Sequence, residues 1–513
     1  MTESRRIILN TLASYGRAVF AMFVGVFSSR WLLMGLGAED LGLQCVVGSL
    51  IGAIVIFETV MQVAVARFYA FAIGKAQVMD EEEGRDEICR WFNVVFLIHL
   101  ALPLLIMIFG YPLGLYAVRH WLTIPAARMG ACVFVFKCSM VVAFISMVST
   151  PYIAMYQARQ LIVELSLFGV LRTVMNFGFT FSLLYVTCDR LEYSGLFSAI
   201  VALGVLGAQM YRGWRHFPEC RVRAEYLFDM SRFRRIFTYF GCEFYSCFGA
   251  MFMNQGSSIV VNRFFGPQVN AAKSIATTLS NQAMSLSNSL IGAFLPAVTT
   301  KAGTGESEKS EGLASRSSKF GTLLILLFSV PLIAEMDEVL HLWLVDPPQY
   351  TNQFCICILV AQVVEKLGIG HHVLISAYGR VGVYHIVVGS TIVMSVPILF
   401  TLIALDVGPV AIGYMYVIVN TFVCVERWFL ARWLVGMPIL TYLCKSLIPV
   451  LVAAVFAQGS AWICTYCVAP SFGRICLTSL MSTIVLLLIS FEWVLDREEK
   501  EIVIHAVRRF VHR

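Results

Sequence analysis

Apolar runs recur along the whole of this 513-residue chain, and each run of about 20 residues is long enough to cross a bilayer as a helix. Hydrophobic residues make up 58% of the sequence and charged residues only 14%, a composition that is not that of a soluble enzyme. Gly, Pro and charge clusters separate about fourteen such runs. We therefore expect an all-α polytopic membrane protein with about fourteen transmembrane helices.

A polar or small face occurs twice in these apolar helices, in the first run and again in the seventh. Both stripes follow the α-helical period, so each keeps one face of its helix polar. The stripes are Asn10, Ser14, Arg17, Ala21, Gly25 and Ser28, and Tyr239, Glu243, Ser246, Ala250, Asn254 and Ser257. An ungapped alignment places Ala21–Gly37 on Ala250–Gly266. This match predicts two duplicated halves, each beginning with a helix that faces water.

The duplication predicts two halves, or lobes, of the chain, and the apolar runs that follow them predict two further spans. We expect the first lobe over residues 1–220, the second over 221–435, the added helices over 436–495 and a cytoplasmic tail over 496–513. Most of the 38 Lys and Arg residues then lie in cytoplasmic segments, so the positive-inside rule places both termini in the cytoplasm. The net charge of +6 is explained by this topology, and we expect no nucleic-acid partner.

The 15 cysteines lie mostly within apolar segments, where a thiol behaves as a small hydrophobic group. Their spacing does not resemble a metal-binding framework, and we expect neither a metal nor a cofactor. Cys464 and Cys467 form one close pair near a helix end, and both a disulfide and simple packing fit their spacing.

Charged side chains within the apolar runs are the main candidates for a binding site, because each costs at least about 2.5–3.5 kcal/mol at the bilayer centre. Six cations lie within the predicted spans, namely Arg17, Arg30, Lys137, Arg172, Lys366 and Lys445. Only three acids do, namely Glu58, Glu243 and Glu365. The embedded charge is net positive, which favours an anionic passenger.

These cations differ in depth. Arg30 and Lys445 lie close to span ends, where a long side chain reaches the interface. The deeper residues Arg17, Lys137 and Arg172 are expected to line a cavity. The alternative for them is burial against a carboxylate such as Glu58, which would lock helices together without contacting a ligand.

Two later runs also carry polar residues. In the eighth run, Ala271–Leu290, one line of the helix is polar, which predicts a border on an aqueous cavity or, alternatively, a tightly packed interhelical seam. This line consists of Ser274, Thr278, Asn281, Ser285 and Asn288. In the tenth run, EKLGIGHH interrupts an apolar stretch from Glu365 to His372. Adjacent Glu365 and Lys366 are expected to point in different directions, and both an ion-binding unwound stretch and a polar kink fit this sequence.

Two segments, Ser28–Leu50 and Asn262–Gln282, resemble the polysaccharide flippases of the multidrug/oligosaccharidyl-lipid/polysaccharide exporter superfamily. In that family the first span of each half ends in a Leu-Gly or Phe-Gly step before a polar turn, and here the steps end at Gly37 and Gly266. The span endings Pro296–Thr299 and Ala377–Arg380 are also similar to those of the family. The resemblance implies two six-helix lobes, related by a parallel repeat, that form a V-shaped central cavity, with two added helices at the carboxyl end. It also implies alternating-access transport of an undecaprenyl-pyrophosphate-linked oligosaccharide from the cytoplasmic to the outer face of a bacterial inner membrane.

The embedded charges and this resemblance together predict the roles of particular residues. For the phosphates we expect Arg17 and Arg172, with Lys137 and Lys366 as further contributors. For the sugars we expect Asn254, Asn281, Ser285 and Asn288, and for proton or sodium coupling Glu243, Glu58 and Glu365. The expected partners are membrane lipids, the anionic lipid-linked glycan and glycan-assembly enzymes, and the expected state is a monomer.

Two other transport classes stay open. A cation-coupled multidrug antiporter of the same superfamily would depend on the embedded acids, and a lipid II flippase would share the cationic cavity and the fourteen spans. An enzyme is not expected, because the sequence has no acid pair, nucleophile elbow, metal-ligand spacing or phosphate-binding loop.

Overall fold

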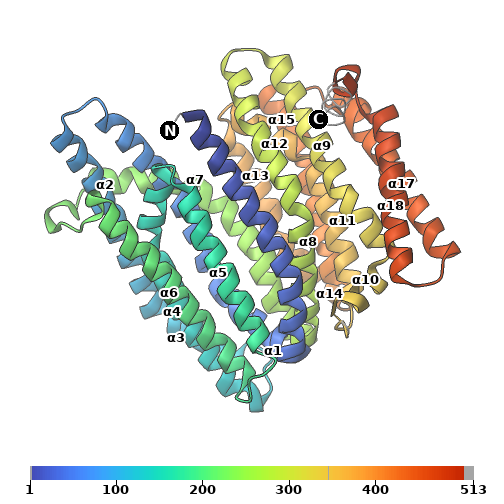
Figure 1. Cartoon of the computed structure of the whole chain (residues 1–513), viewed down its shortest axis with the longest axis horizontal. Coiled ribbons are helices and arrows are strands. Elements are labelled where there is room, and N and C mark those ends of the chain that lie inside the picture. The colour runs from blue at the N-terminus through green and yellow to red at the C-terminus, as the bar shows by residue number, and fades with distance from the viewer. Residues whose placement is uncertain (1–2, 345, 502–513) are drawn as a thin grey trace. The chain divides into compact units, whose positions relative to one another are not determined.

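The structure is a computed structural model that describes residues 3–344 and 346–501. The side chains of some helical residues, Glu243 among them, lie outside the described set. All regular secondary structure in the described chain is helical (Figure 1). Ten of the described helical segments are long and apolar enough to cross a bilayer. The predicted fold class, an all-α polytopic membrane protein, is confirmed.

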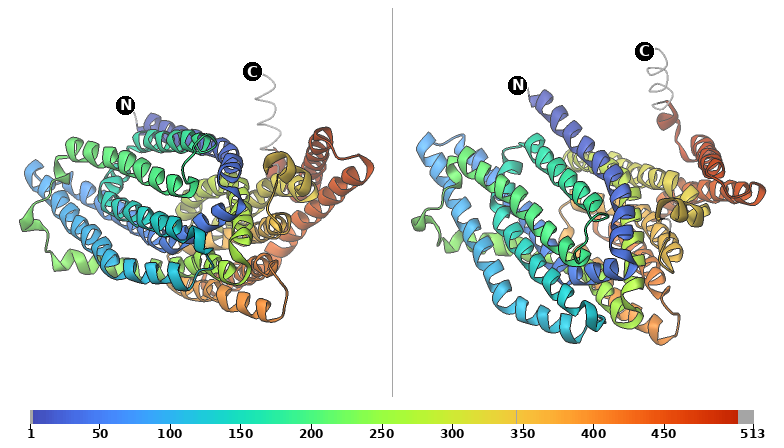
Figure 2. Two further views of the ribbon diagram at one scale, coloured as in Figure 1. Left: turned by 90° about the horizontal axis from the view of Figure 1, so that it is seen from below. Right: turned by 60° about the horizontal axis from the view of Figure 1, so that its bottom comes forward.

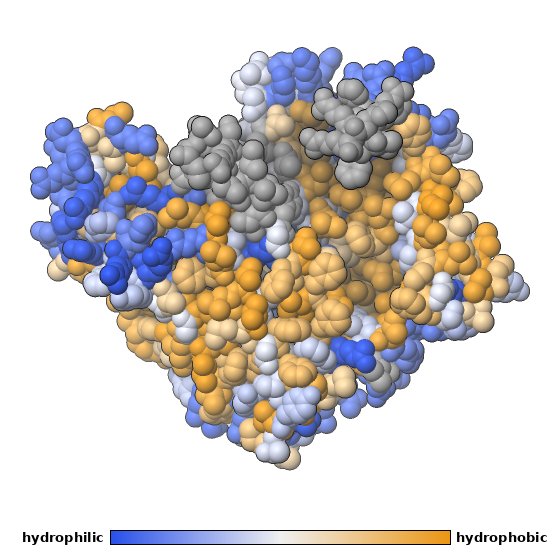
Figure 3. All heavy atoms as spheres, in the orientation of Figure 1, coloured by the Kyte–Doolittle hydropathy of each residue, from blue (hydrophilic) through white to orange (hydrophobic). Residues whose placement is uncertain are grey.

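The surface is divided in the way that a bilayer requires. Figure 3 shows apolar side chains along the middle of the helices and hydrophilic side chains at the ends that carry the loops. Among the longer helices, the ten apolar segments leave out α7 (Met230–Met251), all of α8 (Ser257–Gly303), α15 (Ala411–Val435) and the part of α1 (Glu3–Ala76) after residue 52. These four are helical as well, so the number of helical segments approaches the about fourteen spans expected from the apolar runs.

The chain forms two compact units, Met1–Ser274 and Ile275–Arg513, and the boundary lies within α8. Unit 1 contains the elements from α1 to the first part of α8. Between these it contains α2 (Glu81–Leu105), η1 (Ile106–Gly110), α3 (Tyr111–His120), α4 (Met129–Ala158), α5 (Ile162–Ser182), α6 (Arg190–His216), α7 and η5 (Phe252–Gly256). Elements η1 and η5 are π-helical turns that connect α2 to α3 and α7 to α8 without a loop.

Unit 2 contains the rest of α8 and all later helices. Its elements are α9 (Ser307–Ala334), α10 (Met336–Leu344), α11 (Thr351–Leu367), α12 (Ile369–Ala377), α13 (Val381–Val393), α14 (Ser395–Ala404), α16 (Ile439–Tyr442), η6 (Leu443–Leu447), α17 (Ile448–Cys467), α18 (Phe472–Ile489) and η7 (Ser490–Val494), together with α15. The expected tail from residue 496 lies mostly outside the described residues.

A single glycine breaks each of the two longest helices. Gly37 in α1 has φ 76° and ψ 168°, and Gly266 in α8 has φ 84° and ψ 178°. Only glycine adopts such a conformation without steric cost, because any Cβ atom would clash with the backbone. The two breaks occupy the positions that coincide when Ala21 is aligned on Ala250, so the repeated sequence forms the same local structure twice.

The segments that follow the two breaks pack closely within unit 1. A Cβ atom on Gly42 would lie only 1.8 Å from the carbonyl oxygen of Pro267, so the two backbones touch at this glycine. The Asn270 side chain donates a hydrogen bond to the Gly42 carbonyl oxygen at 3.3 Å. Any larger residue at position 42 would therefore separate these helices.

An ion cluster holds the same end of unit 1 together. Arg128, just before α4, donates to Asp40 of α1 at 2.8 Å and to Asp189, the N-cap of α6, at 2.6 Å. Burial acts to raise the pKa of Asp189, but the hydrogen bond from Arg128 and the backbone amides of α6 outweigh it and lower the pKa. The cluster is therefore charged at neutral pH, and its contribution to stability is lost only as the pH falls through the lowered pKa of Asp189.

The α17–α18 hairpin docks on α9 of unit 2 through a buried ion pair at each end, and its two helices run side by side (Figure 2). Arg474 at the start of α18 donates to Glu335, which follows α9, at 2.8 Å. At the other end, Lys319 of α9 donates to Glu499 at 2.8 Å. All four residues are buried, so removal of one partner would leave an uncompensated charge. Cys464 and Cys467 are both free thiols, so no disulfide closes the hairpin.

Replacement of Arg474 should therefore destabilise the hairpin strongly. We expect R474M to lower the free energy of unfolding by about 3–5 kcal/mol, because Glu335 would remain buried without its cation. The double variant Glu335→Leu/Arg474→Met should recover much of this loss. The measurement is the thermal or denaturant unfolding of the purified protein in detergent.

The matched control is Lys309→Met, since Lys309 pairs with Glu306 but is 69% exposed. An exposed pair contributes at most about 1 kcal/mol, so this variant should unfold nearly as the wild type does. Equal losses of stability for R474M and K309M would contradict this role of the buried Arg474–Glu335 pair.

Candidate substrate-binding site

In unit 1 the structure places Arg17 of α1 against Gly169 of α5. A Cβ atom on Gly169 would lie 2.7 Å from the δ carbon of Arg17, so the arginine side chain covers this glycine. Arg172 lies one helical turn further along α5, on the same face as Gly169. Both arginines are exposed. The predicted pair of cations is therefore brought to one face of α5.

This face of α5 is polar along its length. Asn176 is exposed on it, and the hydroxyl groups of Thr173 and Thr180 donate to carbonyl oxygens one turn earlier in the helix, at 2.9 Å and 2.7 Å. Such hydroxyls satisfy themselves within the helix and do not need water. Among the described residues, the unsatisfied donors on this face are then chiefly the two guanidinium groups.

Glu58 lies near Arg172, but its carboxylate is hydrogen-bonded to another helix. It is buried in α1, and its carboxylate accepts a hydrogen bond from the Ser146 hydroxyl of α4 at 2.8 Å. The charge of Arg172 attracts it, although the two side chains form no direct ion pair in the described part of the chain. Glu58 thus compensates one cation in part and leaves the local charge net positive.

Lys137 does not join this cluster. It lies nine residues before Ser146 in α4, which is two and a half helical turns, so the two side chains are on opposite faces. Exposed Phe134 and Val141 flank Lys137 on its own face. The sequence does not reveal which face of α4 carries Lys137, because α4 is apolar on several sides.

The polar line predicted in the eighth span belongs to α8. Asn281 and Asn288 are exposed and Ser285 is half-buried, whereas Ser280 and Ser287 on another side are buried. The Ser287 hydroxyl donates to the Gly321 carbonyl oxygen of α9 at 2.8 Å, so this second side forms the packed seam. The packed seam is therefore confirmed for one face of the helix, and the border on an aqueous cavity stays a prediction for the other.

Glu365 and Lys366 do not point apart, contrary to the expectation from their adjacency. The Lys366 ammonium lies 2.7 Å from the Glu365 carboxylate, because the long lysine side chain bends back along the helix. Lys366 also donates to the Asn288 side chain at 2.8 Å, and Glu365 accepts from Arg427 at 3.2 Å. Glu365 and Lys366 are therefore ion-pair partners within this buried cluster, and Lys366 also orients the Asn288 side chain.

Sequence reasoning missed two buried cations. Arg427 of α15 contacts Glu365 and donates to the Tyr384 hydroxyl at 3.0 Å. Lys273 of α8 donates to the Asn254 carbonyl oxygen at 2.8 Å and to the hydroxyls of Ser257 and Ser258. The sequence signal for Lys273 is its isolated charge in the otherwise uncharged run Ala271–Leu290.

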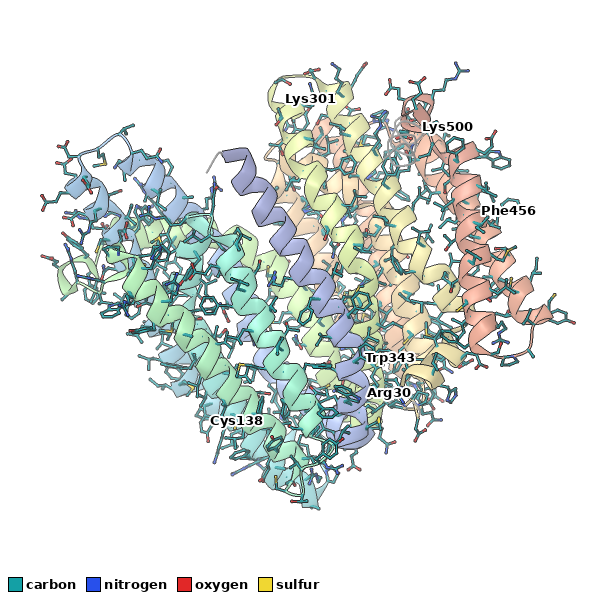
Figure 4. All side chains as sticks on the ribbon, viewed as in Figure 1. Arg30, Cys138, Lys301, Trp343, Phe456 and Lys500 are labelled. Carbon is teal, nitrogen blue, oxygen red and sulfur yellow. The ribbon has the colours of Figure 1, made fainter. Side chains whose placement is uncertain are left out.

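Asn254, predicted to contact sugars, lies in the π-helical turn η5. Its side chain donates to the Ala250 carbonyl oxygen at 2.9 Å, and its own carbonyl accepts from Lys273. Arg30, predicted to reach the interface, lies near the end of the first part of α1, before the break (Figure 4). Lys445 is exposed in η6. The predicted coupling residue Glu243 has a side chain outside the described set.

Comparison with known proteins places this arrangement in a known fold. No protein-family model and no curated protein matches the sequence. The lipid II flippase MurJ, in an inward closed conformation, matches with a TM-score of 0.67 at 12% identity, over 94% of this chain and 98% of that chain. An inward-facing multidrug resistance MATE transporter of the MOP superfamily matches with a TM-score of 0.64 at 15% identity, over 82% of this chain and 95% of that chain.

The chain has the fold of MOP-superfamily transporters. A third structure, the MATE multidrug transporter DinF-BH in complex with R6G, agrees, with a TM-score of 0.57 at 14% identity over 84% of this chain and 95% of that chain. The fold that the resemblance implied is thus the fold that these structures share with the chain. At such identities the likeness does not extend to the substrate.

The exposed face of α8 can be tested for contact with water. We expect cysteines introduced by Asn281→Cys and Asn288→Cys to react with a charged, water-soluble thiol reagent, because amide side chains in a membrane span require water or a partner. The measurement is the labelling rate of the reconstituted protein above the wild-type background.

Two controls bracket this result. Ser287→Cys is buried against α9 and should not react. Phe456→Cys on α17 replaces an exposed apolar side chain and should react with an apolar reagent only (Figure 4). Equal labelling of positions 281, 288 and 456 by the charged reagent would contradict the water-lined face.

Proposed function

We propose that this chain flips an undecaprenyl-pyrophosphate-linked oligosaccharide from the cytoplasmic to the outer face of a bacterial inner membrane, with both termini in the cytoplasm. The observation that carries the proposal is the pair of exposed guanidinium groups, Arg17 and Arg172, on one polar face of α5. In the described part of the chain neither has a direct carboxylate partner. A cation within a membrane span is costly unless water or an anion solvates it, so this pair is suited to an anionic ligand.

The chemistry of a pyrophosphate fits this pair. A phosphate cannot enter hydrocarbon without losing its hydration, which costs tens of kcal/mol in a Born estimate. Arginine replaces that hydration well, since its planar guanidinium donates two parallel hydrogen bonds to phosphate oxygens. Arg17 and Arg172 would each hold one phosphate group, while Glu58 keeps Arg172 oriented between transport events.

The polar face of α8 in unit 2 offers a different chemistry. Asn281, Ser285 and Asn288 present amide and hydroxyl groups, which donate to and accept from sugar hydroxyls without adding charge. Lys366 holds the Asn288 side chain in place, so this face is preorganised. We assign it to the glycan and propose alternating access, by which the bound lipid is exposed to one leaflet and then to the other.

A lipid II flippase is the second candidate. The MurJ structure matches 94% of this chain, so at least part of the α17–α18 hairpin falls within the shared fold, whereas the MATE structure matches 82%. A multidrug antiporter is less well supported, because Glu365 is paired with two cations and Glu58 accepts a hydrogen bond from Ser146. These acids are therefore poor candidates for sites that bind a free cation.

The test is charge removal at the two arginines. In a bacterium that lacks its own oligosaccharide-lipid flippase, R17A and R172A should each lower surface glycan by about tenfold or more, since a charge-assisted hydrogen bond contributes about 1.5–3 kcal/mol. Membrane abundance of the protein should not change. Lys137→Ala is the matched control, because it removes a membrane-embedded cation that lies on the face of α4 opposite Ser146. This variant should export normally.

Normal export by both arginine variants would overturn the phosphate assignment. The substrate candidates separate in proteoliposomes that contain either the oligosaccharide lipid or lipid II, in which only one should become accessible from the opposite side. Efflux of a cationic dye that depends on Glu58 or Glu365 would instead identify the antiporter.

A further inference from the structure

A second feature of unit 1 is an apolar groove of about 280 Å³, formed by α1 after its break, η1 with α3, α4 and the first part of α8. Ile54, Ile106, Leu113 and Ile259 are among its lining residues. Leu113 is 65% exposed, so the groove is open at the surface of a membrane-spanning segment. The solvent at this surface is hydrocarbon.

Glycines and an irregular helical turn create the space. The π-helical turn η1 ends at Gly110, and Gly114 follows one turn later in α3. A Cβ atom on Gly114 would lie 2.4 Å from the Phe136 ring of α4, so α3 and α4 approach each other closely beneath the groove. Gly110 has ordinary α-helical angles, φ −74° and ψ −35°, so its backbone does not require a glycine. A Cβ atom on Gly110 would have one close neighbour, the γ2 carbon of Ile106 at 3.3 Å.

One end of the groove is polar and firmly held. Trp121 lies at this end and is 58% exposed, which is typical of tryptophan at a membrane interface. The buried Asn262 side chain accepts from the Thr123 amide at 2.9 Å and donates to its carbonyl oxygen at 3.4 Å. This pair of bonds fixes the turn after Trp121 to α8.

Arg263 follows Asn262 and gives this end a positive charge. It lies four residues after the groove residue Ile259, hence on the same face of α8, and it is exposed. Helical side chains lean toward the N-terminus of their helix, which directs Arg263 back over the Ile259 turn. The groove therefore has a hydrocarbon-lined body, an aromatic residue at the interface and a guanidinium group above it.

We propose that this groove is a binding site for an anionic phospholipid, with one acyl chain in the groove and the phosphate on Arg263. An apolar groove suits an acyl chain, and a guanidinium group suits a phosphate, so together they indicate an anionic phospholipid. The site is separate from the Arg17 and Arg172 pair and does not depend on the proposed substrate. Its walls come from α1 after the Gly37 break, from α8 before the Gly266 break, and from η1, α3 and α4, so a bound lipid stabilises their packing.

The experiment measures retained lipid on the purified full-length protein by native mass spectrometry. The probes are phosphatidylglycerol and phosphatidylethanolamine with identical acyl chains, added in equal amounts. The wild type should retain phosphatidylglycerol preferentially. R263Q should reduce that preference by about tenfold, the factor expected for one charge-assisted hydrogen bond. Gly110→Leu, which fills the floor of the groove, should reduce retention of both lipids.

The controls are matched in chemistry and position. Arg119→Gln removes an exposed arginine at the same end of α3, but from a different face, since it lies two residues from both Ala117 and Trp121. Gly204→Leu adds the same side chain to an open helical position of α6. Both controls should retain phosphatidylglycerol as the wild type does. Unchanged thermal unfolding of Gly110→Leu shows that its loss of lipid is not a loss of fold.

Three results would overturn the proposal. The first is retention of phosphatidylglycerol by R263Q and Gly110→Leu at the wild-type level. The second is an equal loss in Arg119→Gln, which would indicate a diffuse charge effect. The third is displacement of all bound lipid by geranylgeranyl phosphate with no retention of phosphatidylglycerol, which would identify the groove as an isoprenoid site.

Discussion

The cost of placing a charge in hydrocarbon governs this structure. Most embedded charges avoid that cost by finding a partner: Glu335 binds Arg474, Glu365 binds Lys366 and Arg427, and the Lys273 ammonium is surrounded by a carbonyl and two hydroxyls. Arg17 and Arg172 are different, since they stay exposed on a polar face. The distinction between satisfied and unsatisfied cations separates the groups that hold helices together from those that are suited to hold a ligand.

Glycine provides the second constraint, because a long membrane helix can turn only where its backbone leaves the helical conformation. The breaks at Gly37 and Gly266 have nearly the same angles, and the hydrogen bonds around them also repeat. Ser29 donates to the Gly25 carbonyl oxygen, and Ser258, at the corresponding position, donates to that of Asn254. The duplication is therefore visible in the local structure as well as in the amino-acid sequence. Both breaks lie in unit 1, where the segments after them touch at Gly42.

Sequence reasoning succeeded where a property depends on local periodicity. The apolar runs give the fold class, and the polar line of Asn281, Ser285 and Asn288 follows from residue spacing alone. It failed where long side chains or neighbouring helices decide. Lys366 reaches back to Glu365, which backbone direction does not reveal, and the face of α4 that carries Lys137 is set by packing against α1 and α6. Lys273 was missed because its partners are hydroxyls and a carbonyl, which leave no opposite charge to detect.

The sequence by itself determined that the chain is helical and polytopic and that the segment around Gly37 is repeated around Gly266, because hydrophobicity and a repeat are both properties of residue order. Only the tertiary structure decided which charges are neutralised and which remain available. Arg17 and Arg172 are far apart in the chain and lie along the same face of α5, while Glu58 accepts a hydrogen bond from Ser146 of a third helix. Such partnerships depend on how helices face one another, and helical periodicity does not specify that.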